Sequence, residues 1–147
     1  MKFAIDRARI KTSLATPPPS PPPVHVLVVD DDESVGMACV EMLTRAGFAA
    51  SGAETAEQAW EALSFAHYHL VITDYQMPKA SGLELARQMR AAGMMQPVIL
   101  ISGMPEIEKL ALDASCRIDE VLPKPFSLPE LLTRVNAALD SAQRPPR

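Results

Sequence analysis

Short apolar runs alternate with amphipathic segments along most of this chain, and this alternation is the feature that most restricts its fold. Three of the runs are rich in β-branched residues and too short for helices: 24–29 (VHVLVV), 69–73 (HLVIT) and 97–102 (PVILIS). Runs of this kind are typical of strands that are buried on both faces of a parallel sheet. Two weaker strands are expected at 48–52 and 120–122.

Helices are expected between these strands and after the last one. Apolar residues at helical spacing predict helices over 34–46, 55–66, 81–92 and 105–114, and a final helix that begins at Leu128. On the first helix, the residues predicted to face the core are Val35, Ala38, Cys39, Met42 and Ala46. Five strand–helix units joined by right-handed crossovers require a parallel sheet with helices on both faces. The predicted fold class is therefore α/β, a flavodoxin-like (βα)5 doubly wound sheet with strand order 2-1-3-4-5.

Composition divides the chain into a proline-rich start, one domain and a short tail. The run TPPPSPPP at 16–23 has six prolines in eight positions. Proline lacks the backbone N–H that a helix or sheet needs, so this run is expected to form an extended polyproline II tether, with docking to a proline-reading partner as the alternative. We expect residues 1–23 to be a disordered extension, residues 24–141 to form the domain and residues 142–147 to be a short disordered tail.

Charge is distributed unevenly along the chain. The formal net charge is −4, yet residues 1–23 hold four basic side chains against one acidic, whereas residues 24–140 hold eight basic against 17 acidic. An acidic domain argues against direct nucleic-acid binding. No apolar run reaches the length of about 18 residues that a membrane span requires. Cys39 and Cys116 are expected to be buried free thiols in a cytoplasmic protein.

Polar side chains stand at the carboxyl ends of four predicted strands. Asp30 and Asp31 follow the first strand, Asp74 the third and Lys124 the fifth, and Ser102 ends the fourth. In the predicted strand order these ends lie on one edge of the sheet. Three carboxylates gathered there raise each other's pKa unless a cation lies between them, and oxygen ligands without His or Cys favour Mg²⁺. A lysine and a hydroxyl opposite them suit phosphoryl oxygens, so the set predicts phosphoryl transfer to a carboxylate.

Four segments resemble, in order, the signature segments of bacterial response-regulator receiver domains: VLVVDDDES, VITDYQMPKASGLEL, VILISG and VLPKPF. The resemblance covers residues 24–140. It implies that Asp74 is the phosphorylated aspartate and that Asp30 and Asp31 hold Mg²⁺. The backbone carbonyl of Gln76 would be a further metal ligand.

The resemblance also assigns roles on the far side of the phosphoryl group and to partner proteins. It implies that Ser102 is the switch hydroxyl, that Lys124 contacts the phosphoryl group, and that the Lys124–Pro125 peptide bond is cis. The phosphodonor would be a histidine kinase or a histidine phosphotransfer protein that docks near the first helix. Output would pass to an unknown downstream protein, with no nucleic-acid or membrane contact, and a weak homodimer is left open.

Three positions depart from the receiver pattern or tune it. Val121 stands where many receivers have an aromatic residue that rotates on activation, and the preceding segment SCRIDE lacks the glycine that is common there. Gln76 and Met104 occupy the positions, two beyond Asp74 and two beyond Ser102, that control loss of the phosphoryl group. A methionine cannot position a water molecule by hydrogen bonding, so slow self-dephosphorylation is expected.

The sequence leaves two other functional hypotheses open. The acids Asp30 and Asp32 also resemble the opening motif of haloacid-dehalogenase-type phosphatases, in which Asp30 would be the nucleophile of an enzyme; the receiver reading predicts no enzyme. Alternatively, the chain keeps the fold as an interaction module without phosphorylation. Acids that follow a strand also complement the dipole of the next helix without further function. The remaining acids of these loops are expected to be solvated: Asp32, Glu33, Asp119 and Glu120.

Overall fold

The computed structural model describes residues 23–104 and 106–143. Its strands are β1 (His25–Val29), β2 (Ala49–Ala53), β3 (Leu70–Asp74), β4 (Val98–Ser102) and β5 (Glu120–Pro123). They form a parallel sheet in the order β2-β1-β3-β4-β5, which confirms the predicted fold class and strand order. The extension 1–22 and the end of the tail, 144–147, were predicted to be disordered and lie outside the described residues.

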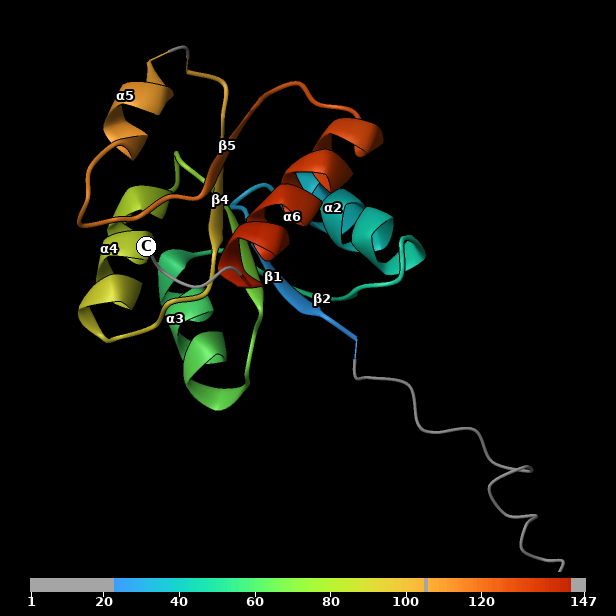
Figure 1. Ribbon diagram of the computed structural model, residues 1–147, viewed down its shortest axis with the longest axis horizontal. Coiled ribbons are helices and arrows are strands. Elements are labelled where there is room, and N and C mark those ends of the chain that lie inside the picture. The colour runs from blue at the N-terminus through green and yellow to red at the C-terminus, as the bar shows by residue number, and fades with distance from the viewer. Residues whose placement is uncertain (1–22, 105, 144–147) are drawn as a thin grey trace, which may run out of the picture.

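Helices cover both faces of this sheet (Figure 1). The helices are α2 (Glu33–Arg45), α3 (Ala56–Phe65), α4 (Gly82–Ala91), α5 (Ile107–Ala111) and α6 (Leu128–Gln143). On one face, α2 and α6 pack against alternate strand residues such as Val28 and Ile72. On the other face, α3, α4 and α5 pack against the intervening residues, such as Leu27 and Val71. Each large aliphatic side chain buried in this way contributes about 1.5–3 kcal/mol.

The buried face of α2 differs from the predicted one. Of the predicted residues only Cys39 is buried; Ala38 and Ala46 are exposed, while Leu43, which was not predicted, is fully buried. The helix begins at Glu33, capped by Asp32, and presents the line of Gly36, Cys39 and Leu43 to the sheet. Alanine carries little apolar area, so its position in the sequence is a weak guide to which side of a helix faces inward.

The other helices follow the sequence more closely. The final helix begins at Leu128 as predicted, and its residues Leu131, Val135 and Ala138 are fully buried, although Leu128 itself is 37% exposed. The helix predicted over 105–114 shortens to Ile107–Ala111. Both cysteines are buried free thiols, as predicted.

Side-chain caps mark the starts of α2, α3 and α4 in the loops that follow β1, β2 and β3. The Asp32 side chain accepts hydrogen bonds from the backbone N–H groups of the first turn of α2, and the Thr55 hydroxyl accepts one from Gln58 N at the start of α3. Ser81 and Glu84 form a capping box at the start of α4. Caps of this kind stabilise a helix by about 1 kcal/mol each. They fix the loops that surround the carboxyl edge of the sheet.

Arg90 holds the opposite edge together through backbone carbonyl groups. Its guanidinium donates to the carbonyl oxygens of Cys116, Met94, Gln96 and Arg117 at 2.7–3.1 Å. Asp119, which was expected to be merely solvated, accepts a hydrogen bond from Val98 N at 2.9 Å and lies 3.5 Å from the Arg90 guanidinium. This network ties the end of α4 to the segment that enters β5.

The turn that follows β3 depends on the absence of a side chain at Gly82. Its N–H donates to the carbonyl oxygen of Tyr75 at 3.0 Å, so the first residue of α4 lies directly on the end of β3. A Cβ at this position would collide with the Asp74 carbonyl oxygen and would lie 3.0 Å from atoms of Thr73 and Leu100. Only glycine fits this approach without displacing the strand end that carries Asp74.

We therefore expect Gly82→Ala to lower the free energy of unfolding by about 1–3 kcal/mol, since the added methyl group overpacks a rigid contact. Urea unfolding followed by circular dichroism measures the change. The matched control is Gly103→Ala, because a Cβ at Gly103 meets no atom within 4 Å. Equal unfolding midpoints for Gly82→Ala and the wild type would show that the strand end yields to the methyl group.

Candidate functional site

Three carboxylates converge at the carboxyl ends of β1 and β3. One oxygen from each of Asp30, Asp31 and Asp74 lies within 4.8 Å of the others. The strands are paired with Val29 opposite Thr73, so the residues that follow them emerge at the same level of the sheet. Asp30 and Asp74 are 4% and 7% exposed, whereas Asp31 faces solvent. The convergence that the strand order predicts is thus observed.

Lys124 faces this acidic group from the end of β5. Its Nζ lies 3.3 Å from Asp74 Oδ1, and its backbone N–H donates to the Ser102 carbonyl oxygen at 2.9 Å. The Lys124–Pro125 peptide bond is cis, as the sequence resemblance implies. The Lys124 side chain is two-thirds buried, and its ammonium group lies against Asp74. The site therefore has an anionic side and a cationic side, with Asp74 between them.

Ser102 supplies a hydroxyl next to these groups. It ends β4, next to β3, and is 2% exposed. Its Oγ accepts a hydrogen bond from Met104 N at 2.9 Å, which fixes the oxygen and leaves its O–H free to donate. The strand register puts Ile101 opposite Asp74, so Ser102 lies one position beyond the carboxylate.

Burial makes the charged forms of two of these acids costly. Loss of solvent raises the pKa of Asp74, and the Lys124 ammonium opposes this shift while Asp30 adds to it. Loss of solvent also raises the pKa of Asp30, against the opposing effect of the hydrogen bond from Asp32 N. A cation between the carboxylates would remove this cost. The donor set consists of oxygens, which fits a hard ion such as Mg²⁺.

Gln76 lies in the loop that follows β3, beside the acids. Together with Tyr75, Met77 and Pro78 it borders a groove of about 440 Å³ that Asp31 lines from the other side. The structure thus places Gln76 near the acids, while ligation through its backbone carbonyl stays a prediction.

The Gln76 side chain points to Met104. Its Nε2 lies 3.4 Å from the Met104 sulfur, so side chains from the loops after β3 and β4 meet above the site. Thioether sulfur is a weak acceptor and cannot donate a hydrogen bond. Farther from the acids, Val121 is partly buried against the core formed with α3, α4 and α5.

One feature near the site has no simple sequence signal. Asp30 also lines a second, larger groove that runs along α2 toward the start of α3. Its walls come from three separate segments, each unremarkable in sequence, so only the fold reveals it.

Comparison with known proteins gives a consistent result. The family model described as "Response regulator receiver domain" matches residues 26–136. The protein PetR of Rhodobacter capsulatus is 36% identical over 125 residues, which cover 85% of this chain and 50% of PetR. A probable transcriptional regulatory protein, SilR of Salmonella typhimurium, is 34% identical over 79% of this chain and 51% of its own length. The chain thus spans about half the length of the curated relatives that it matches.

Solved structures agree with this family. A response regulator receiver protein from Pseudomonas putida is 34% identical, with a TM-score of 0.73, over 80% of this chain and 98% of that one. The response regulator TrrA of Thermotoga maritima, solved in complex with Mg²⁺ and BeF, is 32% identical, with a TM-score of 0.71, over 79% and 99% of the two chains. Within the described ranges, no helix has the length and hydropathy needed to cross a bilayer.

The raised pKa of Asp30 predicts how pH acts on stability. Because the folded-state pKa lies above the ordinary value of 3.8, ionisation of this carboxyl costs the folded state stability as the pH rises toward neutrality. In a buffer containing a chelator at pH 7, Asp30→Asn should therefore unfold at a higher urea concentration than the wild type. The amide oxygen can still accept the hydrogen bond from Asp32 N.

The stabilisation should shrink as the pH falls through the raised folded-state pKa and disappear below 3.8, where the wild-type carboxyl becomes protonated in both states. The control is Asp140→Asn on the exposed side of α6, which should not change stability at either pH. An Asp30→Asn protein less stable than the wild type at pH 7 would contradict the electrostatic account.

Proposed function

The chain belongs to the response regulator receiver domain family, and from this premise we propose that Asp74 is its phosphoacceptor. Receiver domains are signalling domains, and phosphorylation of an aspartate is their general mechanism. The observation that carries the assignment is the contact of 3.3 Å between Asp74 Oδ1 and Lys124 Nζ, made by a carboxylate that also belongs to the acidic group. Of the three acids, Asp74 is the one that also forms an ion pair with Lys124. We take residues 24–141 as the extent of the receiver domain.

We propose that Asp30, Asp31 and Asp74 hold Mg²⁺, together with the backbone carbonyl of Gln76. The support is the set of three carboxylate oxygens within 4.8 Å of one another and the raised pKa of two of these acids. When bound, the ion would neutralise charge on the phosphoryl oxygens and on the carboxylates. Receiver domains bind Mg²⁺ at such an acidic pocket.

In the proposed reaction, an oxygen of Asp74 attacks the phosphorus atom of a phosphohistidine. A P–O bond forms, the P–N bond breaks, and its electron pair returns to the imidazole ring of the donor. Lys124 then pairs with a phosphoryl oxygen in place of the carboxylate oxygen that it contacts at 3.3 Å. The O–H of Ser102 donates to another phosphoryl oxygen, while the hydrogen bond that its oxygen accepts from Met104 N holds the hydroxyl in place.

The same proposal covers partners and location. The phosphodonor is a histidine kinase or a histidine phosphotransfer protein, and the phosphorylated form is read by a downstream protein. A cytoplasmic location fits the two buried free thiols. The geometry favours this role over the phosphatase alternative, because the lysine contacts Asp74 and no ion pair of the described residues joins it to Asp30.

The assignment is tested by incubating the protein with Mg²⁺ and a small phosphodonor such as acetyl phosphate, followed by intact-mass measurement. We expect one phosphoryl group on the wild type and none on Asp74→Ala, with an unchanged circular dichroism spectrum. The matched control Asp140→Ala removes an exposed acid of α6 and should label as the wild type does. Full labelling of Asp74→Ala, or an adduct mapped to Asp30, would overturn the assignment.

Contact between Gln76 and Met104 predicts a long-lived phosphoryl group. The thioether cannot donate a hydrogen bond to a water molecule, and it engages one N–H of the Gln76 amide, so hydrolysis should take minutes or longer. Met104→Asn supplies a hydrogen-bonding side chain there and should shorten the lifetime several-fold, measured by phosphate release. Met104→Leu is the matched control and should keep it. Lifetimes of seconds for the wild type would refute the shielding.

A further inference from the structure

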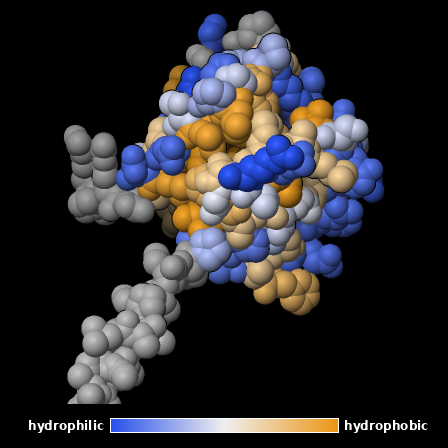
Figure 2. Space-filling model, turned by 90° about the vertical axis from the view of Figure 1, so that its right-hand side faces the viewer, coloured by the Kyte–Doolittle hydropathy of each residue, from blue (hydrophilic) through white to orange (hydrophobic). Residues whose placement is uncertain are grey.

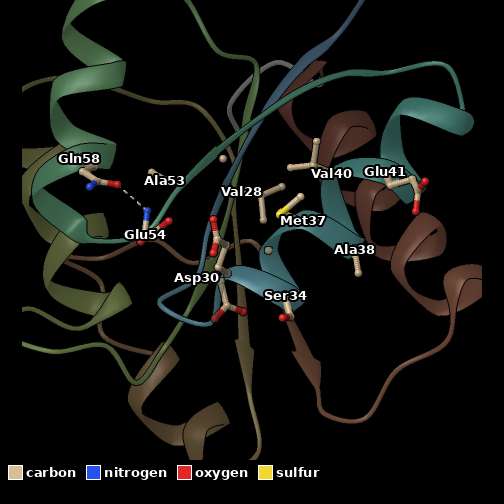
Figure 3. Close-up of a pocket in the computed structure, with 13 residues that line it drawn as sticks. Val28, Asp30, Ser34, Met37, Ala38, Val40, Glu41, Ala53, Glu54 and Gln58 are labelled. Carbon is tan, nitrogen blue, oxygen red and sulfur yellow. Dashed lines mark hydrogen bonds between the residues drawn. The ribbon is translucent and has the colours of Figure 1, made fainter.

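A groove of about 710 Å³ runs between α2 and the end of β2. Figure 3 shows Met37 of α2 reaching toward Val28 of β1, with Val40 farther along the helix. On the opposite wall, Gly52 of β2 has no side chain to fill the groove. A Cβ added there would lie 3.8 Å from Val40. Met37 is 65% exposed, which is unusual for a large apolar side chain on a helix that already faces a core. On the side of the molecule that carries α2 and α6, apolar surface gathers between hydrophilic side chains (Figure 2).

The rim of this groove is acidic. Asp30, Glu33 and Glu41 lie on the α2 side and Glu54 on the α3 side, and no basic residue is among the described residues that line it. Glu41 pairs with Arg45 at 3.2 Å on the open surface. Within the described part of the chain, Glu33 and Glu54 have no cation within ion-pair distance. An apolar floor between carboxylates fits an occupant that carries apolar and cationic side chains together.

Residues 1–15 of this chain have that chemistry. The segment MKFAIDRARIKTSLA interleaves four cations, Lys2, Arg7, Arg9 and Lys11, with the apolar residues Phe3, Ile5, Ile10 and Leu14. It lies outside the described residues and precedes an acidic domain. We propose that residues 1–15 bind this groove in the same molecule, with apolar side chains against Met37 and Val40 and cations against the acidic rim.

The tether between the two has the required reach. The groove lies at the carboxyl end of β1, five residues from the point where the chain enters the strand. At about 3.3 Å per residue, β1 spans about 17 Å. The proline-rich run 16–23 has eight residues, which in polyproline II geometry extend about 25 Å at 3.1 Å per residue. A tether of this length exceeds the length of β1, so residues 1–15 are within reach of the groove.

Charge also favours residues 1–15 over a second copy of the folded domain as the occupant of the groove. Residues 24–140 hold 17 acidic and eight basic side chains, so a second copy would bring like charge to the acidic rim, whereas residues 1–23 hold four basic and one acidic. Because Asp30 belongs to both the groove and the acidic site, a bound segment lies beside the phosphoacceptor. Any partner that covers the amino-terminal half of α2 must first displace it.

The proposal is tested on the full chain by NMR, without phosphodonor or Mg²⁺, so the outcome is independent of the phosphorylation assignment. The variant Phe3→Ser with Ile10→Ser keeps the net charge and removes two apolar contacts. We expect the backbone amide signals of Gly36, Gly52 and Glu54 to shift, while that of Gly93 at the far end of α4 stays in place. The same shifts should follow when the four cations are reversed by Lys2→Glu, Arg7→Glu, Arg9→Glu and Lys11→Glu.

A second pair of substitutions removes negative charge from the acidic rim of the groove. Glu33→Gln with Glu54→Gln should give the groove signals of the unbound state and make them insensitive to Phe3→Ser with Ile10→Ser. The matched control Glu57→Gln with Glu61→Gln alters two exposed acids of α3 outside the groove and should keep the wild-type response. Groove signals that ignore every change in residues 1–15 overturn the proposal. Shifts that grow with protein concentration overturn it too, since they assign the segment to a neighbouring copy.

Discussion

The repulsion among three carboxylates at one edge of the sheet is the constraint on which the rest of this structure depends. The pairing of Val29 with Thr73 brings Asp30 and Asp74 to the same level, and neither residue can move away without breaking a buried strand. Lys124 compensates only in part, because the pKa of Asp74 and that of Asp30 stay raised. The fold therefore holds a site that is more stable once positive charge enters it. Binding of a cation and folding are linked in this way.

Most of the fold and the geometry of the site could be predicted from the sequence, because both are encoded locally. A strand buried on two faces must be a short apolar run, and in a parallel sheet its polar neighbour at the carboxyl end must lie at the ligand-binding edge. Asp30, Asp74 and Ser102 are each the polar end of such a run. The sequence pattern alone therefore predicts at which edge of the sheet these side chains lie.

The two wrong predictions, the inward face of α2 and the solvated Asp119, have a common physical cause. In each case the residue that determines the structure lies far away in the sequence or has no side chain. The inward face of α2 is set by its approach to Asp30 and Gly52, and alanines on the helix gave a misleading stripe. Asp119 was expected to be solvated because its partners, Val98 N and the Arg90 guanidinium, lie 21 and 29 residues away. Hydrogen bonds to backbone groups leave no residue-type signature, so no spacing rule could have found them.

Asp30 connects the two acidic regions of the surface. It contributes one oxygen to the group formed with Asp31 and Asp74, and it also lines the groove along α2. Positive charge placed at the groove therefore lowers the same electrostatic cost that a metal ion lowers at the site, while it competes with that ion for one carboxylate. Two cationic ligands that share an acid must be coupled, and the sign of the coupling depends on which term is larger. The fold thus couples positive charge in the groove to positive charge at the acidic group through a single side chain, Asp30.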